Sequence, residues 1–90
     1  MITIDDILDW ESEHEEDFIL DGGNDLNEHQ NAELLDLFNL SVGIKYNAPT
    51  FESLDDLLNH PWKDVEDLKE LMLETVVDYL NSINFTLKNK

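Results

Sequence analysis

Carboxylates are the residues of this sequence whose number and spacing could do chemistry. Five of them recur three or four residues apart near the beginning of the chain: Asp6, Asp9, Glu13, Glu16 and Asp17. Residues at these intervals lie ~5–6 Å apart on one side of a helix, so the five side chains would form one row of negative charge. A row with gaps of this size approximates the charge spacing of a nucleic-acid backbone. It predicts a surface that occupies the basic, nucleic-acid-binding site of another protein.

The charge of the whole chain points to the same kind of partner. Its 90 residues include 22 acids and 5 bases, for a formal net charge of −17. Residues 1–44 contain 13 of the acids and no base, whereas residues 45–90 contain 9 acids and all five lysines. Such asymmetry between halves indicates a charged partner. Because phosphate contacts need Lys or Arg, we expect that partner to be a basic protein and expect no direct binding to nucleic acid.

Two further features extend the predicted surface. The polar segment 21–28 adds carboxylates after a Gly-Gly turn, and Trp10 lies between two acids, outside the first apolar stripe. Tryptophan is enriched at binding hot spots, so Trp10 is a candidate apolar anchor, although it could instead reach the core. The predicted partner-binding residues are Asp6, Asp9, Trp10, Glu13, Glu16, Asp17, Asp21, Asp25 and Glu28.

Motifs for catalysis and metal binding are missing from the sequence. It contains no cysteine, and its three histidines form no i, i+4 pair. A calcium loop starting at Asp21 would require Gly in place of Leu26 and Glu in place of Ala32. There is neither a Gly-x-Ser-x-Gly nucleophile motif nor a glycine-rich phosphate loop. We therefore expect a protein that is not an enzyme and that has no cofactor and no metal site.

Helices must position the acids of the first half. Thr3 can cap a helix that runs from about residue 4 to residue 18 or 20. After the Gly-Gly break, Asn24 or Asp25 can cap a second helix, with Glu28 as the acid of a capping box. Gly43 stands where a left-handed residue would end that helix, and residues 42–46 alternate weakly, as a short extended segment would.

The second half predicts two more helices. Thr50 or Ser53 starts a short one, and Pro61 closes it and opens the next as its first residue. Apolar residues from Val65 to Ile83 follow helical spacing and predict a long helix that ends near residue 84 or 85. The expected fold is a small all-α bundle of three to four helices, forming one domain over residues 1–90 with residues 86–90 as a flexible tail. The alternative is an α+β fold with three short strands at 18–20, 42–46 and 84–87.

The expected location is the cytoplasm. No stretch contains the ~18 apolar residues that a membrane span needs. The N-terminal residues also lack the basic segment followed by an apolar run that is typical of a secretion signal. The sequence does not specify an oligomeric state.

These observations predict a non-enzymatic acidic inhibitor or immunity-type protein. It would block the nucleic-acid-binding surface of a nuclease, a DNA- or RNA-binding factor or a CRISPR-type effector by nucleic-acid mimicry. Proteins of this class are often products of phages or mobile elements. The alternative is a structural or adaptor subunit that binds through apolar helix faces. The run Leu54-Asp55-Asp56-Leu57-Leu58 matches a short leucine motif that docks into hydrophobic grooves.

A third possibility comes from a resemblance. The run Glu52-Ser53-Leu54-Asp55 resembles the Asp-Ser-Leu motif of acyl carrier proteins, and residues 77–81 are similar to their last helix. Acyl carrier proteins are small, acidic and helical, and the resemblance implies a phosphopantetheinyl group on Ser53. The chain departs from that pattern because the preceding Gly is missing, Glu52 replaces Asp, and the distance from Ser53 to Tyr79 is short.

Overall fold

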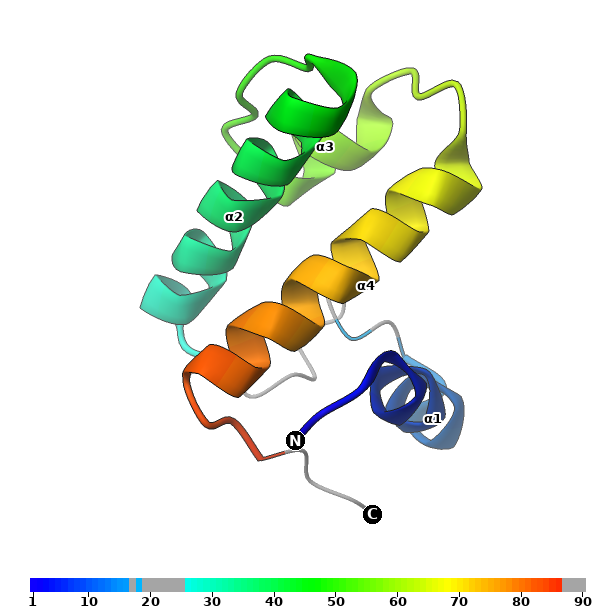
Figure 1. The fold of residues 1–90 in the computed structure, drawn as a ribbon, viewed down its shortest axis with the longest axis vertical. Helices are drawn as coiled ribbons and strands as arrows, with labels where there is room; N and C mark the ends of the chain where they lie inside the picture. The colour runs from blue at the N-terminus through cyan, green and yellow to red at the C-terminus, as the bar shows by residue number, and fades with distance from the viewer. Residues whose placement is uncertain (17, 19–25, 87–90) are drawn as a thin grey trace.

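The computed structural model describes residues 1–16, 18 and 26–86 (Figure 1). Within them the chain forms four helices: α1 (Ile4–His14), α2 (Glu28–Tyr46), α3 (Leu54–Asn59) and α4 (Val65–Ser82). This confirms the prediction of a small all-α bundle. The α+β alternative is wrong, because the described residues include no strand and residues 42–46 belong to α2. Most of the predicted tail, residues 87–90, lies outside the described residues.

Helix α4 is the central element of the bundle. It packs against both α2 and α1, which lie on either side of it in Figure 1. The core contains apolar side chains from all four helices and from two residues outside them, Ile2 and Phe18. The buried helical residues are Ile7, Trp10, Leu34, Phe38, Val42, Leu57, Leu68, Met72, Leu73, Val76, Tyr79 and Leu80. The strong apolar stripe of the last helix therefore faces both of its neighbours.

Helix α1 ends earlier than its sequence predicts. Glu15 adopts a left-handed conformation with a φ of 53°, and its N–H donates to the Glu11 carbonyl. The chain then turns so that Phe18 is only 1% exposed, with its ring 5.0 Å from that of Trp10 in an edge-on contact. Burying a phenylalanine contributes about 1.5–3 kcal/mol, whereas a left-handed residue costs roughly 1–2 kcal/mol. Burial therefore outweighs the strain, and the prediction of a helix to residue 18 or 20 is wrong.

The residue that caps the start of α2 is neither Asn24 nor Asp25, the two that the sequence predicts. Asn27 occupies the N-cap position: its side-chain oxygen accepts from the Gln30 N–H at 2.8 Å, and its own N–H donates to the Gln30 side chain at 3.0 Å. These reciprocal bonds satisfy two of the N–H groups that a helix start leaves without partners. Glu28 is thus the first helical residue, and not the acid of a capping box.

The end of α2 also differs from the prediction. The helix continues through Gly43 to Tyr46, and the left-handed residue is Asn47, with a φ of 54°. Val42 is fully buried, and the Tyr46 ring lies 5.3 Å from the Trp62 ring. Packing of this extra turn overrides the low helix propensity of Gly43. The predicted extended segment at 42–46 is therefore wrong.

Helices α3 and α4 follow the sequence pattern more closely. Ser53 caps α3 as predicted, since its hydroxyl accepts from the Asp56 N–H at 3.1 Å. Helix α4 starts at Val65, directly after its N-cap residue Asp64. The prediction that Pro61 is its first residue is therefore wrong. The intervening residues are tied to α3, because the Trp62 indole N–H donates to the Leu57 carbonyl at 2.7 Å.

Two asparagines connect parts of the backbone that are distant in sequence. The Asn81 side chain on α4 accepts from the Ile2 N–H at 2.8 Å and donates to the Ile2 carbonyl at 2.9 Å. Asn39 on α2 makes the same pair of bonds to Phe51, at 2.8 and 2.9 Å. Each amide thereby satisfies both backbone groups of one residue, as a neighbouring strand would. We call these contacts the asparagine clamps.

One buried hydroxyl leads to a testable prediction. The Tyr46 hydroxyl is buried without a hydrogen-bond partner among the described residues. An unsatisfied buried group costs about 1–3 kcal/mol. Tyr46→Phe should therefore leave the free energy of unfolding unchanged or raise it by up to about 1 kcal/mol, as measured by urea denaturation.

The matched control for this prediction is Tyr79→Phe. The Tyr79 hydroxyl donates to Glu33 at 3.4 Å, so its removal should lower the free energy of unfolding by about 0.5–1.5 kcal/mol. A clear loss of stability in Tyr46→Phe would contradict the prediction, because it would show that the Tyr46 hydroxyl makes a stabilising bond.

Candidate functional site

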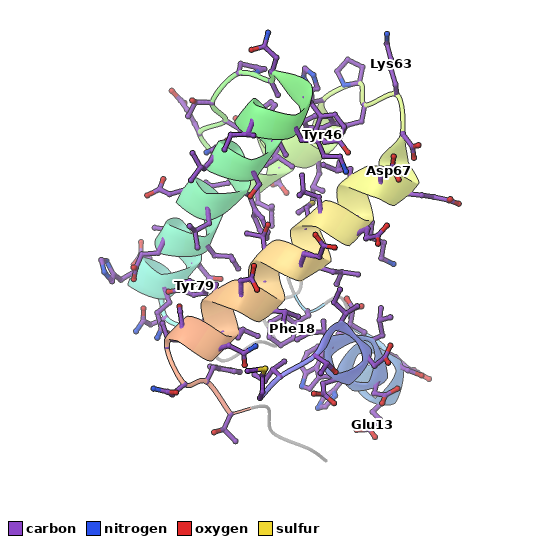
Figure 2. All side chains as sticks on the ribbon, in the orientation of Figure 1. Glu13, Phe18, Tyr46, Lys63, Asp67 and Tyr79 are labelled. Atoms are coloured by element: carbon purple, nitrogen blue, oxygen red, sulfur yellow. The ribbon has the colours of Figure 1, made fainter. Side chains whose placement is uncertain are left out.

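The outward face of α1 carries a group of exposed carboxylates: Asp5, Asp6, Asp9 and Glu13. The opposite face holds Ile7 and Trp10, which are buried. Figure 2 shows Glu13 on the outer side of α1. Asp6 also has a local role, since its carboxylate accepts from the Thr3 N–H at 2.9 Å in the capping box of the helix. Asp9 and Glu13 have no such role, which leaves their carboxylates facing solvent.

The charge of this face is not neutralised by any described part of the chain. The ion pair found among the described residues is on α2, between His29 and Glu33 at 3.2 Å. No carboxylate of α1 pairs with a described lysine or histidine. Like charges three and four apart on a helix repel each other by about 0.2–0.5 kcal/mol per pair. A cationic surface from another molecule would remove this repulsion.

The predicted row of five acids is only partly formed. Asp6, Asp9 and Glu13 share α1, but Glu16 follows the left-handed residue that ends the helix and does not continue the row, although it is exposed. Glu28 is exposed at the start of α2. The predicted site residues Asp17, Asp21 and Asp25 lie outside the described residues.

Trp10 does not form an exposed anchor. Its side chain is only 5% exposed, and its ring stacks on His14 at 4.2 Å and meets Phe18 edge-on at 5.0 Å. The alternative, that Trp10 reaches the core, is the one the structure confirms. The reason is the turn after α1, which brings Phe18 against the side of the helix where Trp10 lies.

A second row of acids on α4 was not identified from the sequence. Asp67, Glu70, Glu74 and Asp78 are all exposed and follow spacings of three, four and four residues. They lie opposite the buried stripe of α4, a helix that contains none of the predicted site residues. The signal in the sequence is the same spacing of three and four residues that predicts the α1 row.

The leucine motif of α3 is used inside the domain. Leu57 is fully buried, and Leu54 and Leu58 pack against the core. The apolar side of this short helix is therefore occupied by the rest of the chain. Ser53, the residue that the acyl-carrier resemblance singles out, is partly buried and caps α3.

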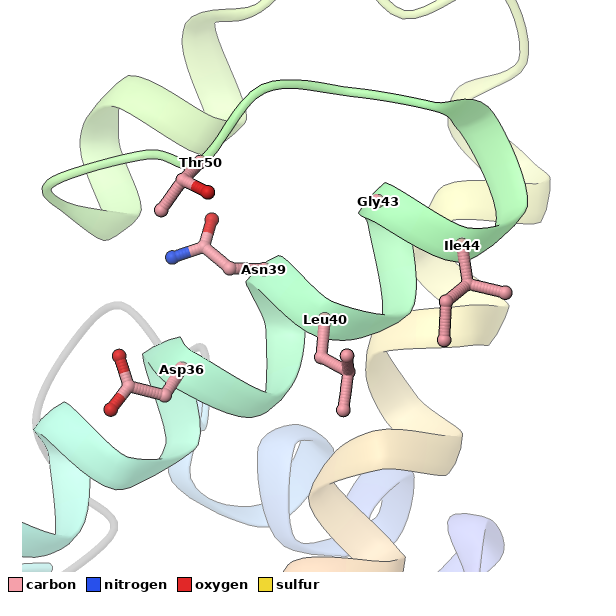
Figure 3. Close-up of a pocket in the computed structure, with 6 residues that line it drawn as sticks. All are labelled: Asp36, Asn39, Leu40, Gly43, Ile44 and Thr50. Atoms are coloured by element: carbon pink, nitrogen blue, oxygen red, sulfur yellow. The ribbon is translucent and has the colours of Figure 1, made fainter.

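A shallow groove on α2 is another feature that the sequence did not reveal (Figure 3). It has a volume of about 400 Å³ and is lined by Asp36, Asn39, Leu40, Gly43, Ile44 and Thr50. Leu40 is 60% exposed and Ile44 is 78% exposed. We call this feature the α2 groove.

The described residues hold no group of three or more His, Cys, Asp or Glu side chains that could bind a metal ion. Most of the acidic segment 21–28 lies outside them. None of the helices in the described part of the chain has the length and apolar character needed to cross a membrane.

Comparison of the chain with protein-family models, with curated proteins and with solved structures gives no match. The chain's own surfaces are therefore the basis for a functional proposal.

Proposed function

We propose that this chain is a non-enzymatic acidic protein that binds the basic, nucleic-acid-binding surface of another protein and blocks it. The partner would be a nuclease, a DNA- or RNA-binding factor or a CRISPR-type effector. The observation that supports the proposal is the outward face of α1, where exposed carboxylates lie without a cationic partner in the described chain.

The mechanism follows from electrostatics. A protein that binds nucleic acid does so with Lys and Arg side chains arranged to meet phosphates. Asp9 and Glu13 lie one turn apart and would meet such side chains at ~5–6 Å intervals. The net charge of −17 would attract a basic partner over several ångströms and speed association, with a rate that falls as salt increases. The partner could then no longer hold its nucleic acid.

The experiment that tests this proposal compares two double charge reversals. Asp9→Lys with Glu13→Lys changes the α1 face, and Glu70→Lys with Glu74→Lys makes the same charge change on α4. A partner captured from host-cell lysate at low salt, and identified by mass spectrometry, would be purified and titrated with each variant. We expect the α1 variant to bind at least tenfold more weakly than the α4 variant, and we expect duplex DNA or RNA to compete with the chain.

The outcomes separate the proposal from its rivals. Neither variant should be less stable than the original chain, because a lysine at position 9 or 70 lies three residues after an exposed aspartate, Asp6 or Asp67, and because the net negative charge falls. Equal weakening by both variants would show that only total charge matters, and stronger weakening by the α4 variant would place the surface on α4. Binding that is insensitive to salt and to both variants would instead favour an adaptor that binds through apolar faces.

A further inference from the structure

The α2 groove is an apolar surface without a partner in the described chain. Helices at protein surfaces normally turn apolar residues toward the core and polar residues toward water. Helix α2 departs from this rule near its end, where Leu40 and Ile44 are exposed although Phe38 and Val42 already face the core. Exposed large apolar residues that adjoin one another mark candidate interaction sites.

The shape of the groove is built into the helix. Leu40 and Ile44 lie one turn apart and extend in the same direction in Figure 3. Gly43, which lines the groove beside them, has no side chain, and a Cβ there would approach only the Ala48 carbonyl, at 3.9 Å. This position therefore leaves a hollow that another molecule's side chain can enter.

The far wall of the groove is fixed by an asparagine clamp. Asn39 holds both backbone groups of Phe51, and this contact places the neighbouring Thr50 beside α2. The groove therefore exists before any ligand binds. A preformed site binds more tightly than one that must first be ordered, because less conformational entropy is lost on binding.

Charge selects the occupant of the groove. Asp36 is exposed, lies one turn before Leu40 and lines the groove. Lys45, the neighbour of Ile44, has its amino group 5.6 Å from the centre of the Tyr46 ring. A second copy of the chain would bring another charge of −17 to this surface, which opposes self-association. The complementary occupant is a segment with apolar residues flanked by Lys or Arg.

We propose that the α2 groove is the docking site for a basic amphipathic helix of a partner protein. An apolar side chain of that helix sits against Leu40 and Ile44 and over Gly43, and one of its cations meets Asp36. Apolar residues at intervals of one helical turn are the usual way in which a helix recognises a groove. The inference rests on the proposed function only in taking the partner to be positively charged. The groove supplies the apolar contact that Trp10, which is buried, cannot make.

The test uses a synthetic helical peptide of leucine and lysine as the probe, with leucines at i, i+3, i+4 and i+7 and lysines elsewhere. Binding to the full chain is followed by fluorescence anisotropy of the labelled peptide. Leu40→Gln with Ile44→Gln should weaken binding at least tenfold. Leu8→Gln, which changes an exposed leucine on α1, is the matched control and should leave the affinity unchanged.

A second variant fills the groove without removing its walls. Gly43→Gln introduces a better helix former, so α2 should remain folded. Its side chain should occupy the hollow and weaken peptide binding at least fivefold. Circular dichroism of every variant would verify that helix content is retained.

Four results would overturn the inference. The first is unchanged peptide affinity in the Leu40→Gln, Ile44→Gln variant, and the second is equal binding of a peptide with the same composition in shuffled order. The third is a dimer of the original chain, detected by sedimentation, that the same variant dissociates, because the groove would then hold a second copy. Loss of peptide binding only in the Asp9→Lys, Glu13→Lys variant would refute the groove and leave the proposed function standing.

Discussion

Replacing Phe18 with alanine should lower the free energy of unfolding by about 3–5 kcal/mol, the range observed when a buried aromatic ring is removed. The Phe18 side chain is 1% exposed and contacts Trp10 edge-on. A domain of this size has a total stability of roughly 5–13 kcal/mol. The substitution would therefore remove a large share of this stability. The turn at Glu15 would also lose the burial of the Phe18 side chain, which offsets its left-handed conformation.

This prediction can be checked by urea denaturation at fixed ionic strength. Phe18→Leu retains much of the buried volume and should lose far less stability, since volume-conserving changes usually cost under about 1.5 kcal/mol. Ile44→Ala removes apolar atoms from a side chain that is already exposed and should change stability by about 0.5 kcal/mol or less. A loss below 1 kcal/mol for Phe18→Ala would show that this ring does not hold the turn after α1.

The contrast between α3 and α1 shows which parts of the fold can be predicted from the sequence. The start of α3 is determined by Ser53 and the N–H of a residue three positions away, so it is visible in a short window. The end of α1 depends on where Phe18 packs, which is a tertiary contact. The same holds for α2, whose last turn is retained through Gly43 because Val42 and Tyr46 find neighbours in the folded chain.

The same distinction between local sequence patterns and tertiary contacts applies to the candidate sites. Exposure of Asp9 and Glu13 follows from helical spacing and could be predicted. The burial of Trp10 could not, since it requires the position of Phe18. The α2 groove could not either, because apolar residues occur on more than one side of α2, and only the packing of Phe38 and Val42 shows which side faces the core.

The two proposed surfaces would contribute differently to binding. Charge on the outward face of α1 acts over a distance and raises the rate of association. Apolar contact in the α2 groove acts only after docking and lowers the rate of dissociation, which is the rate that most interface changes affect. The chain would thus find its partner through carboxylates and remain bound through Leu40 and Ile44.

The asparagine clamp on Ile2 provides the second large effect. Asn81→Asp keeps the size of the side chain and the oxygen that accepts from the Ile2 N–H, but it replaces the amide donor with a carboxylate oxygen. That oxygen would lie near the Ile2 carbonyl, which accepts the present bond at 2.9 Å. Losing the bond and leaving the carbonyl without a donor should lower the free energy of unfolding by about 2–4 kcal/mol at pH 7.

The pH dependence of this loss separates the clamp from a general effect of substitution. Protonation gives the introduced carboxyl a donor for the Ile2 carbonyl, so its pKa in the folded state should be raised above the usual ~3.9. A raised folded-state pKa means that stability is present at low pH and is lost as pH rises through that pKa. The deficit of Asn81→Asp relative to the original chain should therefore be smaller at pH 4.5 than at pH 7.5, whereas that of Asn81→Ala should be the same at both. A deficit for Asn81→Asp that is constant between these pH values would mean that the amide donor does not hold Ile2, and that the N-terminal segment is anchored by the burial of the Ile2 side chain instead.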